Sequence, residues 1–221
     1  MNKYLGNLAL LGCILVFSGC GTHTTTASVS DKAQTGFIPD YSVLQPVKSA
    51  EGTQLFRYQK PGVRRGNYSA IIIEPILINQ TQADEKITPE VIQQTQQELD
   101  KVVREHIAKT GFKIVSDAGP GVARVAIAIS GAEVDNEGLK PRNLIPISAA
   151  ITAVSYLIDK QSKMPVLLVE CKITDSQSND LLRAGVMTIK GDTFRNESDT
   201  TTAFLHLAQQ AVTAAVTAST K

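Results

Sequence analysis

Two alternating segments near the C-terminal end, joined by a turn sequence, constrain the fold of this chain most strongly. The first, VLLVECKIT at 166–174, has apolar residues at positions 167, 169, 171 and 173 and polar residues at 170, 172 and 174. Such an alternation is typical of a β-strand with one face in a core. The turn sequence DSQSND and the segment LLRAGVMTIKG follow directly. The pattern predicts an antiparallel hairpin with Cys171 on its core face.

Two helices are predicted on either side of this hairpin in the sequence. Pro89 after the potential cap Thr88 is typical of a helix start, and Gly111 is typical of a helix end. The first helix therefore covers 88–111, and apolar residues recur on one of its faces at helical spacing. The second helix begins at 198 or 199 and ends near 217, with Phe204 in its inner stripe.

Further strands are predicted at 69–78, 112–115 and 123–130. Pro75 cannot donate to a strand ladder, so the strand at 69–78 is expected at a sheet edge or with a bulge. Residues 36–58 carry two prolines among scattered apolar side chains, and we expect an irregular, ordered strap there. The elements together predict an α+β fold: a single antiparallel or mixed sheet of about five strands, with two main helices on one face and the strap before it.

The N-terminal segment has a different composition from the rest of the chain. Lys3 is the only charged residue before Asp31, and the apolar run LGNLALLGCILVF covers 5–17. A run of this length is too short to span a bilayer core, which takes roughly 20 helical residues. It is typical of a secretory signal peptide.

Ser18 and Gly19 before Cys20 resemble the lipobox of bacterial lipoproteins, in which a peptidase cuts just before a lipid-modified cysteine. Cys13 offers a weaker alternative, because a cut there would leave apolar residues 14–17 in the mature chain, and an uncleaved anchor helix is the remaining one. We expect lipidation at Cys20. By resemblance to enterobacterial sorting rules, Gly21 favours the periplasmic face of the outer membrane.

The chain is therefore divided into a signal peptide at 1–19, a lipidated flexible tether at 20–35 and one periplasmic α+β domain at 36–221. The tether is rich in threonine and serine and has no apolar periodicity. The lipid attaches the protein to the membrane.

No catalytic constellation is evident in the sequence. The three histidines stand at 23, 106 and 206, without a second ligand at metal-binding spacing. No G-x-S-x-G elbow occurs, and Asp175, Asp180 and Asp192 are explained by turn and N-cap chemistry. We expect no enzyme, no catalytic residue, no metal and no cofactor. A net charge of +1 argues against a nucleic-acid partner.

One apolar segment, 143–158, has two interpretations. It carries no charge and is too short to span a membrane, so it either packs on the sheet or forms a docking surface. The candidate partner-binding residues are at positions 146, 151 and 156 of this segment (Pro146, Ile151 and Tyr156), together with Tyr41 in the strap.

Three segments together resemble the domain of unknown function 3313 family of Gram-negative lipoproteins. They are GFIPDYSVLQPV, VECKITDSQSNDLLRAGV and DTTTAFLHLAQQA, and the resemblance covers roughly 35–217. Many relatives carry a tryptophan before the last helix, where this chain has Phe194. The resemblance implies an envelope lipoprotein and no particular activity.

Three functions are consistent with these features. The first is an outer-membrane lipoprotein whose domain binds another envelope protein or polymer without catalysis. The second is a self-assembling or secretion-accessory module, in which 143–158 or the Pro75 strand joins copies into a homo-oligomer. The third is a periplasmic hydrolase, for which the sequence offers the least support.

Overall fold

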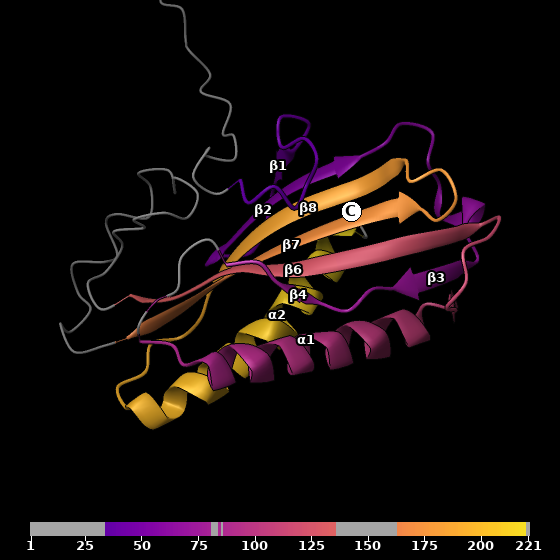
Figure 1. The fold of residues 1–221 in the computed structure, drawn as a ribbon. Coiled ribbons are helices and arrows are strands. Elements are labelled where there is room, and N and C mark those ends of the chain that lie inside the picture. Colours follow the sequence, from indigo (N-terminus) through magenta and orange to yellow (C-terminus); the bar gives the residue numbers. More distant parts are fainter. Residues whose placement is uncertain (1–33, 81–83, 85, 136–162, 220–221) are drawn as a thin grey trace, which may run out of the picture.

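The computed structural model describes residues 34–80, 84, 86–135 and 163–219. Within these residues the chain forms one mixed sheet of eight strands and two helices (Figure 1). The elements are β1 (Gln45–Val47), β2 (Thr53–Gln59), β3 (Ala70–Ile73), β4 (Leu77–Ile78), α1 (Pro89–Lys109), β5 (Lys113–Ile114), β6 (Val122–Asp135), β7 (Met164–Asp175), β8 (Leu181–Lys190) and α2 (Thr200–Ser219), with short 3-10 turns η2 (Arg65–Asn67) and η5 (Glu197–Asp199).

The strand order is β1-β2-β8-β7-β6-β3-β5, with β4 paired to β6 beyond the end of β3. The predicted hairpin is confirmed: β7 and β8 pair antiparallel, with Cys171 opposite Gly185. Both helices pack on the same face of the sheet, and the chain between β3 and β5 crosses that face as α1, which makes β3 parallel to β5 and β6. The α+β class is confirmed.

The prediction of about five strands is wrong, and the difference has two causes. Residues 45–47 and 53–58, predicted as part of the irregular strap at 36–58, belong to β1 and β2. Strand β2 pairs with β8 along its whole length, and β1 pairs with β2. The sequence of β2, TQLFRYQ, shows little contrast because Leu55 and Phe56 are buried on opposite faces. In addition, the strand predicted at 69–78 is divided into β3 and β4.

The division falls at Pro75, as the missing N–H of proline predicts. Glu74 N donates to Val125 O and Asn79 N donates to Ile129 O, so pairing with β6 stops and resumes around the proline. The carbonyl of Ile76 in the gap accepts a hydrogen bond from the Gln96 side chain of α1.

Both predicted helices are confirmed. Thr88 takes the N-cap position of α1 with extended backbone but no capping hydrogen bond from its side chain, and Pro89 follows it. Gly111 has a φ of 83°, the left-handed conformation expected just after a helix end. No helix in the described ranges is long and apolar enough to cross a membrane.

The two faces of the sheet are covered by different parts of the chain. On the helix face, Leu99 of α1 and Phe204 and Leu207 of α2 are buried against the sheet. On the opposite face the cover is residues 34–44, which contain no helix or strand. From here on, the name strap means these residues and not the longer predicted segment 36–58, and we call this face the strap face. The buried apolar side chains of the strap, packed against β2, β6, β7 and β8, are Phe37, Ile38, Tyr41 and Leu44.

Candidate functional site

A cavity of about 560 Å³ lies between the sheet and the two helices, and we call it the helix-face cavity. Side chains of β6, β7 and β8 form its floor, among them Ile127, Val169 and Met187. Val103 of α1 and Val212 of α2 belong to its opposite wall. Most of the lining side chains are apolar, and the volume lies in the range of about 300–1,000 Å³ typical of small-molecule sites.

One row of residues across the sheet explains why the floor leaves space. Arg57, Gly185, Cys171 and Ile127 stand opposite one another on β2, β8, β7 and β6, and all four line the cavity. Gly185 contributes no side chain to this row. A Cβ placed there would have only the Phe56 carbonyl oxygen within 4 Å, at 3.5 Å, so the space above it is open.

The α2 sequence has the same effect from the other side. Its first half fills the core with Phe204 and Leu207, which are fully buried. Its second half lines the cavity with the smaller Ala211, Val212 and Ala215. Small side chains on the wall opposite a glycine keep the sheet and the helix from closing the gap.

Cationic side chains gather in the lining at one end of the cavity. Arg57 lies on β2 and Arg183 on the neighbouring strand β8. Arg57 is opposite Gly185 and Arg183 is opposite Gln59, so the two arginines are diagonal neighbours, and both line the cavity. Arg64 and Arg65 also line the cavity, and the described lining residues include no aspartate or glutamate. Burial, and to a smaller extent the charge of Arg57, lowers the pKa of Arg183 below its usual value.

Arg65 has a structural role at this end. Its guanidinium donates to the carbonyl of Thr110 at the end of α1 and lies 5.2 Å from the centre of the Phe112 ring. These contacts attach the loop between β2 and β3 to α1. The cationic end of the cavity is therefore built by three segments that are distant in the sequence.

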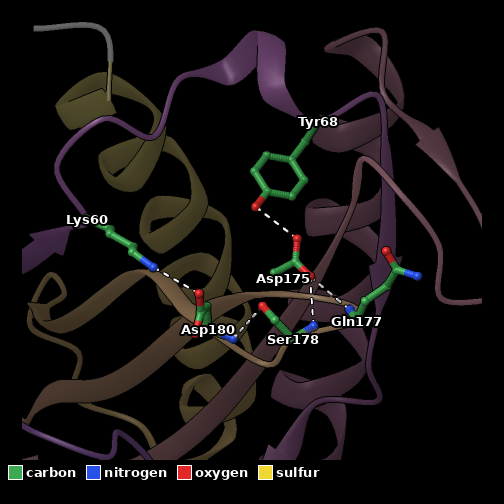
Figure 2. A network of polar contacts seen from close by, with 6 residues as sticks. All are labelled: Lys60, Tyr68, Asp175, Gln177, Ser178 and Asp180. Carbon is green, nitrogen blue, oxygen red and sulfur yellow. Dashed lines mark hydrogen bonds and ion pairs between the residues drawn. The ribbon is translucent and has the colours of Figure 1, made fainter.

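The β7–β8 turn forms a polar network next to this end (Figure 2). Asp175 accepts hydrogen bonds from the backbone N–H groups of Gln177 and Ser178, both at 2.9 Å, and from the hydroxyl of the cavity-lining Tyr68 at 3.1 Å. The backbone hydrogen bonds lower the pKa of Asp175. Asp180 forms a 3.0 Å ion pair with Lys60. The prediction of turn chemistry is confirmed for Asp175, whereas the Asp180 side chain is used in the ion pair.

Cys171 lies in the core side of β7, as predicted, and faces the helix-face cavity. The thiol is half-buried by its accessible surface, but its surroundings are apolar, and this desolvation raises its pKa to about 12. At neutral pH the thiol is therefore protonated and a poor nucleophile. No group of three or more His, Cys, Asp and Glu side chains in the described ranges could hold a metal ion.

A buried carboxylate occupies the other face of the sheet. Glu170 is fully buried, and its oxygens accept hydrogen bonds from the hydroxyls of Tyr41 (2.5 Å), Thr35 (2.5 Å) and Ser130. Asn79 donates to the Thr35 hydroxyl at 3.0 Å. We call Thr35, Tyr41, Ser130 and Glu170 the strap cluster. Its hydrogen bonds attach the strap to β6 and β7.

The structure separates the predicted site residues. Tyr41, a candidate partner-binding residue, is buried between the strap and the sheet, and burial together with its bond to Glu170 raises the pKa of its hydroxyl. It offers no surface to a partner in this conformation, because its ring and hydroxyl are used to cover the sheet. Cys20, Pro146, Ile151 and Tyr156 lie outside the described residues.

The sequence reasoning missed Arg57, Arg183, Gly185 and Glu170. The two arginines and the glycine occupy inward positions of β2 and β8, where a polar residue or a gap interrupts the apolar alternation. A polar residue or a glycine at an inward-facing strand position is the sequence signal that could have indicated a cavity there. For Glu170 there was none, because its position in the alternation is that of a solvent-facing residue.

The chain matches the family model described as "Protein of unknown function (DUF3313)" over residues 33–217. It is 25% identical over 196 residues to "Uncharacterized lipoprotein YdcL" of Escherichia coli K12, covering 86% of this chain and 84% of the relative. These similarities place the chain among bacterial envelope lipoproteins.

Two solved structures show a lower level of similarity. Lipoprotein GNA1162 from Neisseria meningitidis is 11% identical, with 67% of this chain and 96% of that one covered and a TM-score of 0.37. The PelC dodecamer from Paraburkholderia phytofirmans is 9% identical, with coverages of 71% and 95% and a TM-score of 0.36. Scores at this level support no conclusion about fold, assembly or function.

Proposed function

We propose that this chain, which belongs to the DUF3313 family, is an outer-membrane-anchored lipoprotein whose periplasmic domain binds an apolar ligand without catalysis. The helix-face cavity is the observation that carries the proposal. Protein interiors are normally packed to the density of organic crystals, and each unfilled volume reduces stability. An apolar cavity of about 560 Å³ that has charged residues in its lining departs from this normal packing density, and binding of a ligand explains the unfilled space.

The membrane attachment rests on Cys20 and on the similarity to a named lipoprotein. Replacing Cys20 by serine should abolish incorporation of labelled palmitate and release the protein from the membrane fraction. Separation of inner and outer membranes then reports where the unchanged protein resides. Palmitate entering the Cys20→Ser variant would show that another residue is acylated.

Binding in the cavity can be tested on the full protein as cells produce it, purified in lipid nanodiscs. A photoactivatable analogue of hexadecanol, which is apolar and uncharged, serves as the probe. We expect peptide mass spectrometry to find the crosslinks on β7, β8 and α2.

The variant Gly185→Leu places a side chain in the open part of the floor and should reduce this labelling several-fold. Gly119→Leu is the matched control, since a Cβ there makes a comparable ordinary contact, at 3.7 Å to Val122, and the residue does not line the cavity. Equal labelling of the two variants, or labelling scattered over the surface, would contradict the proposal.

A second function, self-assembly, is favoured by one edge of the sheet. Leu77 and Ile78 of β4 and Ile114 of β5 are 52%, 44% and 44% exposed, which is unusual for large apolar side chains in strands. Among the described strands, β4 pairs only with β6 and β5 only with β3. Free strand edges with apolar side chains are sites at which a second chain pairs. Sedimentation should detect an oligomer that Leu77→Lys dissociates, and a monomer at high concentration would exclude this function.

A further inference from the structure

The strap joins the sheet to the segment predicted as a lipidated tether, and its contacts give it a role besides covering the sheet. We propose that the strap is a reserve length of tether: when the membrane anchor is pulled, the strap detaches from the sheet as one unit and extends the reach of the domain. The inference rests on the membrane attachment proposed above, because an unanchored protein would experience no such pull.

Residues 35–44 of the strap are attached to the sheet through side chains. Among the described residues, no hydrogen bond joins the backbone of 35–44 to the backbone of a strand, and the Leu44 N–H donates to the carbonyl of Tyr41 within the strap itself. Buried apolar side chains and the strap cluster hold the segment instead. Strand β2, by contrast, pairs with β8 along its whole length. The strap therefore leaves without breaking the ladders of the sheet.

Glu170 makes this opening all-or-none. Its carboxylate is fully buried, and Thr35 and Tyr41, six positions apart in the strap, both donate to it at 2.5 Å. If only the first part of the strap detached, the carboxylate would lose a donor and stay buried under the rest, which is costly for such a group. When the whole strap leaves, water replaces both hydroxyls. A partly detached strap is therefore disfavoured, and the segment opens as a unit.

The other polar contacts of the strap depend on the same few groups. The Tyr41 hydroxyl accepts hydrogen bonds from the backbone N–H groups of Thr35 and Ile38, both at 3.2 Å. Lys172, two residues after the buried glutamate and on the same face of β7, donates to the carbonyl of Phe37 at 2.9 Å and lies 4.5 Å from the centre of its ring. Because one strand supplies both holding side chains, the contacts of the strap are lost together.

The position of the strap in the chain decides what its release does. The strap follows the predicted tether directly, so a pull on Cys20 acts on the strap before it acts on any strand. Between Cys20 and Gln34 the chain spans at most about 50 Å when fully extended. Release as far as Leu44 raises this limit to about 80 Å. Opening thus extends the reach of the domain, while the sheet, the two helices and the helix-face cavity stay in place.

The test uses the full lipidated protein in nanodiscs that are fixed to a surface. A DNA handle is attached through Gln177→Cys in the exposed β7–β8 turn (Figure 2), and Cys171→Ala removes the free thiol of the domain. As optical tweezers raise the force, we expect one early step of at most about 35 Å, the extended length of residues 35–44. The step should precede unfolding of the sheet and reverse when the force falls. Extraction of the lipid ends the tether and is therefore not mistaken for this step.

Variants of the holding side chains locate the effect. Glu170→Gln keeps the size of the side chain but weakens its hold on the two hydroxyls. The step should then occur at a lower force, and hydrogen exchange of the amides at 35–44 should become at least tenfold faster, as the loss of one charge-assisted hydrogen bond predicts. Lys172→Gln should shift both readouts in the same direction and serves as the second variant if Glu170→Gln does not fold. Glu105→Gln, at an exposed position of α1, removes the same charge as Glu170→Gln and should change neither.

The strap and the anchor fail in different ways. If residues 35–44 exchange at the same rate as α1, or if the first step is unfolding of the whole domain, the inference is overturned and the membrane attachment stands. The inference is likewise overturned if Glu170→Gln and Lys172→Gln both leave the step and the exchange unchanged. If Cys20→Ser shows that Cys20 carries no lipid while 35–44 still exchange as a unit, the proposed membrane attachment fails, and the role of the strap as reserve tether fails with it.

Discussion

The two faces of the sheet are covered in opposite ways. On the helix face, two long helices contribute large apolar side chains such as Leu99 and Phe204, yet a cavity remains beneath them. On the strap face, eleven residues without helix or strand structure, 34–44, close over small side chains such as Ala128 and Ala184 and over the buried Glu170.

This difference shows that the amount of secondary structure does not determine how completely a core is filled. A helix is a rigid cylinder whose side chains sit at fixed intervals, so a glycine below it and alanines on it leave a gap that it cannot close. An irregular segment adapts its backbone to the sheet and satisfies its polar groups one at a time. Here the hydroxyls of Thr35 and Tyr41 converge on one carboxylate.

The largest expected effect tests whether the helix face supplies most of the stability. Phe204→Ala should lower the free energy of unfolding by about 3–5 kcal/mol, because the ring is fully buried and its loss leaves a second cavity. Denaturant unfolding measures the change. Leu205→Ala, the next residue on α2 and only half-buried, should lose clearly less. Equal losses would mean that α2 is less firmly packed than its burial indicates.

The second-largest loss of stability is expected from a substitution in the strap cluster. Tyr41→Phe deletes a donor to Glu170 and an acceptor for the backbone N–H of Thr35 and Ile38, and should cost about 1–3 kcal/mol. Hydrogen exchange should show faster opening at the strap than in α1. Tyr58→Phe is the matched control, since Tyr58 borders the same core and its hydroxyl takes no part in the hydrogen bonds of the strap cluster. A loss shared equally by the strap and α1 would contradict the view that the strap opens by itself.

The third prediction concerns the cavity. Gly185→Leu should raise the free energy of unfolding by about 0.5–2 kcal/mol, because it fills space and replaces glycine within a strand. The same substitution at Gly119 should change it by less than about 0.5 kcal/mol. If Gly185→Leu raises the free energy of unfolding and reduces probe labelling, the unfilled cavity lowers the stability of the unchanged protein and is needed for binding. Destabilisation by Gly185→Leu would mean that the space is needed for packing.

Cys171 has the smallest expected effect on the free energy of unfolding near neutral pH, but its raised pKa has a measurable effect on its reactivity. Its pKa of about 12, against 9.0 for an ordinary thiol, makes the thiolate about a thousandfold rarer at pH 8. Mass spectrometry should therefore find Cys171 alkylated far more slowly in the folded protein than in the denatured one. A rate similar to that of the denatured chain would show that the cavity is open to water at Cys171.

The same thiol affects stability only in alkaline solution. Between about pH 9 and pH 12 the unfolded thiol loses its proton while the folded one keeps it, so the unfolded state binds fewer protons and the free energy of unfolding falls as the pH rises. Cys171→Ala should reduce this fall and change nothing near neutral pH. The pKa of Tyr41 is also raised, so this residue lowers the free energy of unfolding at high pH as well, and it does so equally in the unchanged protein and in Cys171→Ala.

Local sequence signals were sufficient for the elements that form through short-range contacts. The alternation at 166–174 and the turn after it predicted the hairpin, and Pro89 and Gly111 predicted a helix start and a helix end. Pro75 predicted an edge position or a bulge, and the structure divides the strand there. Each of these depends on the conformational preference of a few neighbouring residues, which the sequence states directly.

The arrangement of the site depended on contacts between distant segments. β2 was missed because both of its faces are buried, by the helices on one side and by the strap on the other, so that it shows no amphipathic contrast. Glu170 has the alternation of a solvent-facing residue, and only the strap, more than a hundred residues away in sequence, makes it a buried one.

The sequence alone determined the class of the fold, the hairpin, the helix ends and the prediction of a lipid anchor at Cys20, because these follow from local chemistry. Only the tertiary structure brought Arg57, Arg183, Gly185 and Cys171 around one cavity, since pairing of β2, β8 and β7 decides which side chains become neighbours. Strand register and helix packing are properties of the whole chain, and a binding site made from them is visible only after folding.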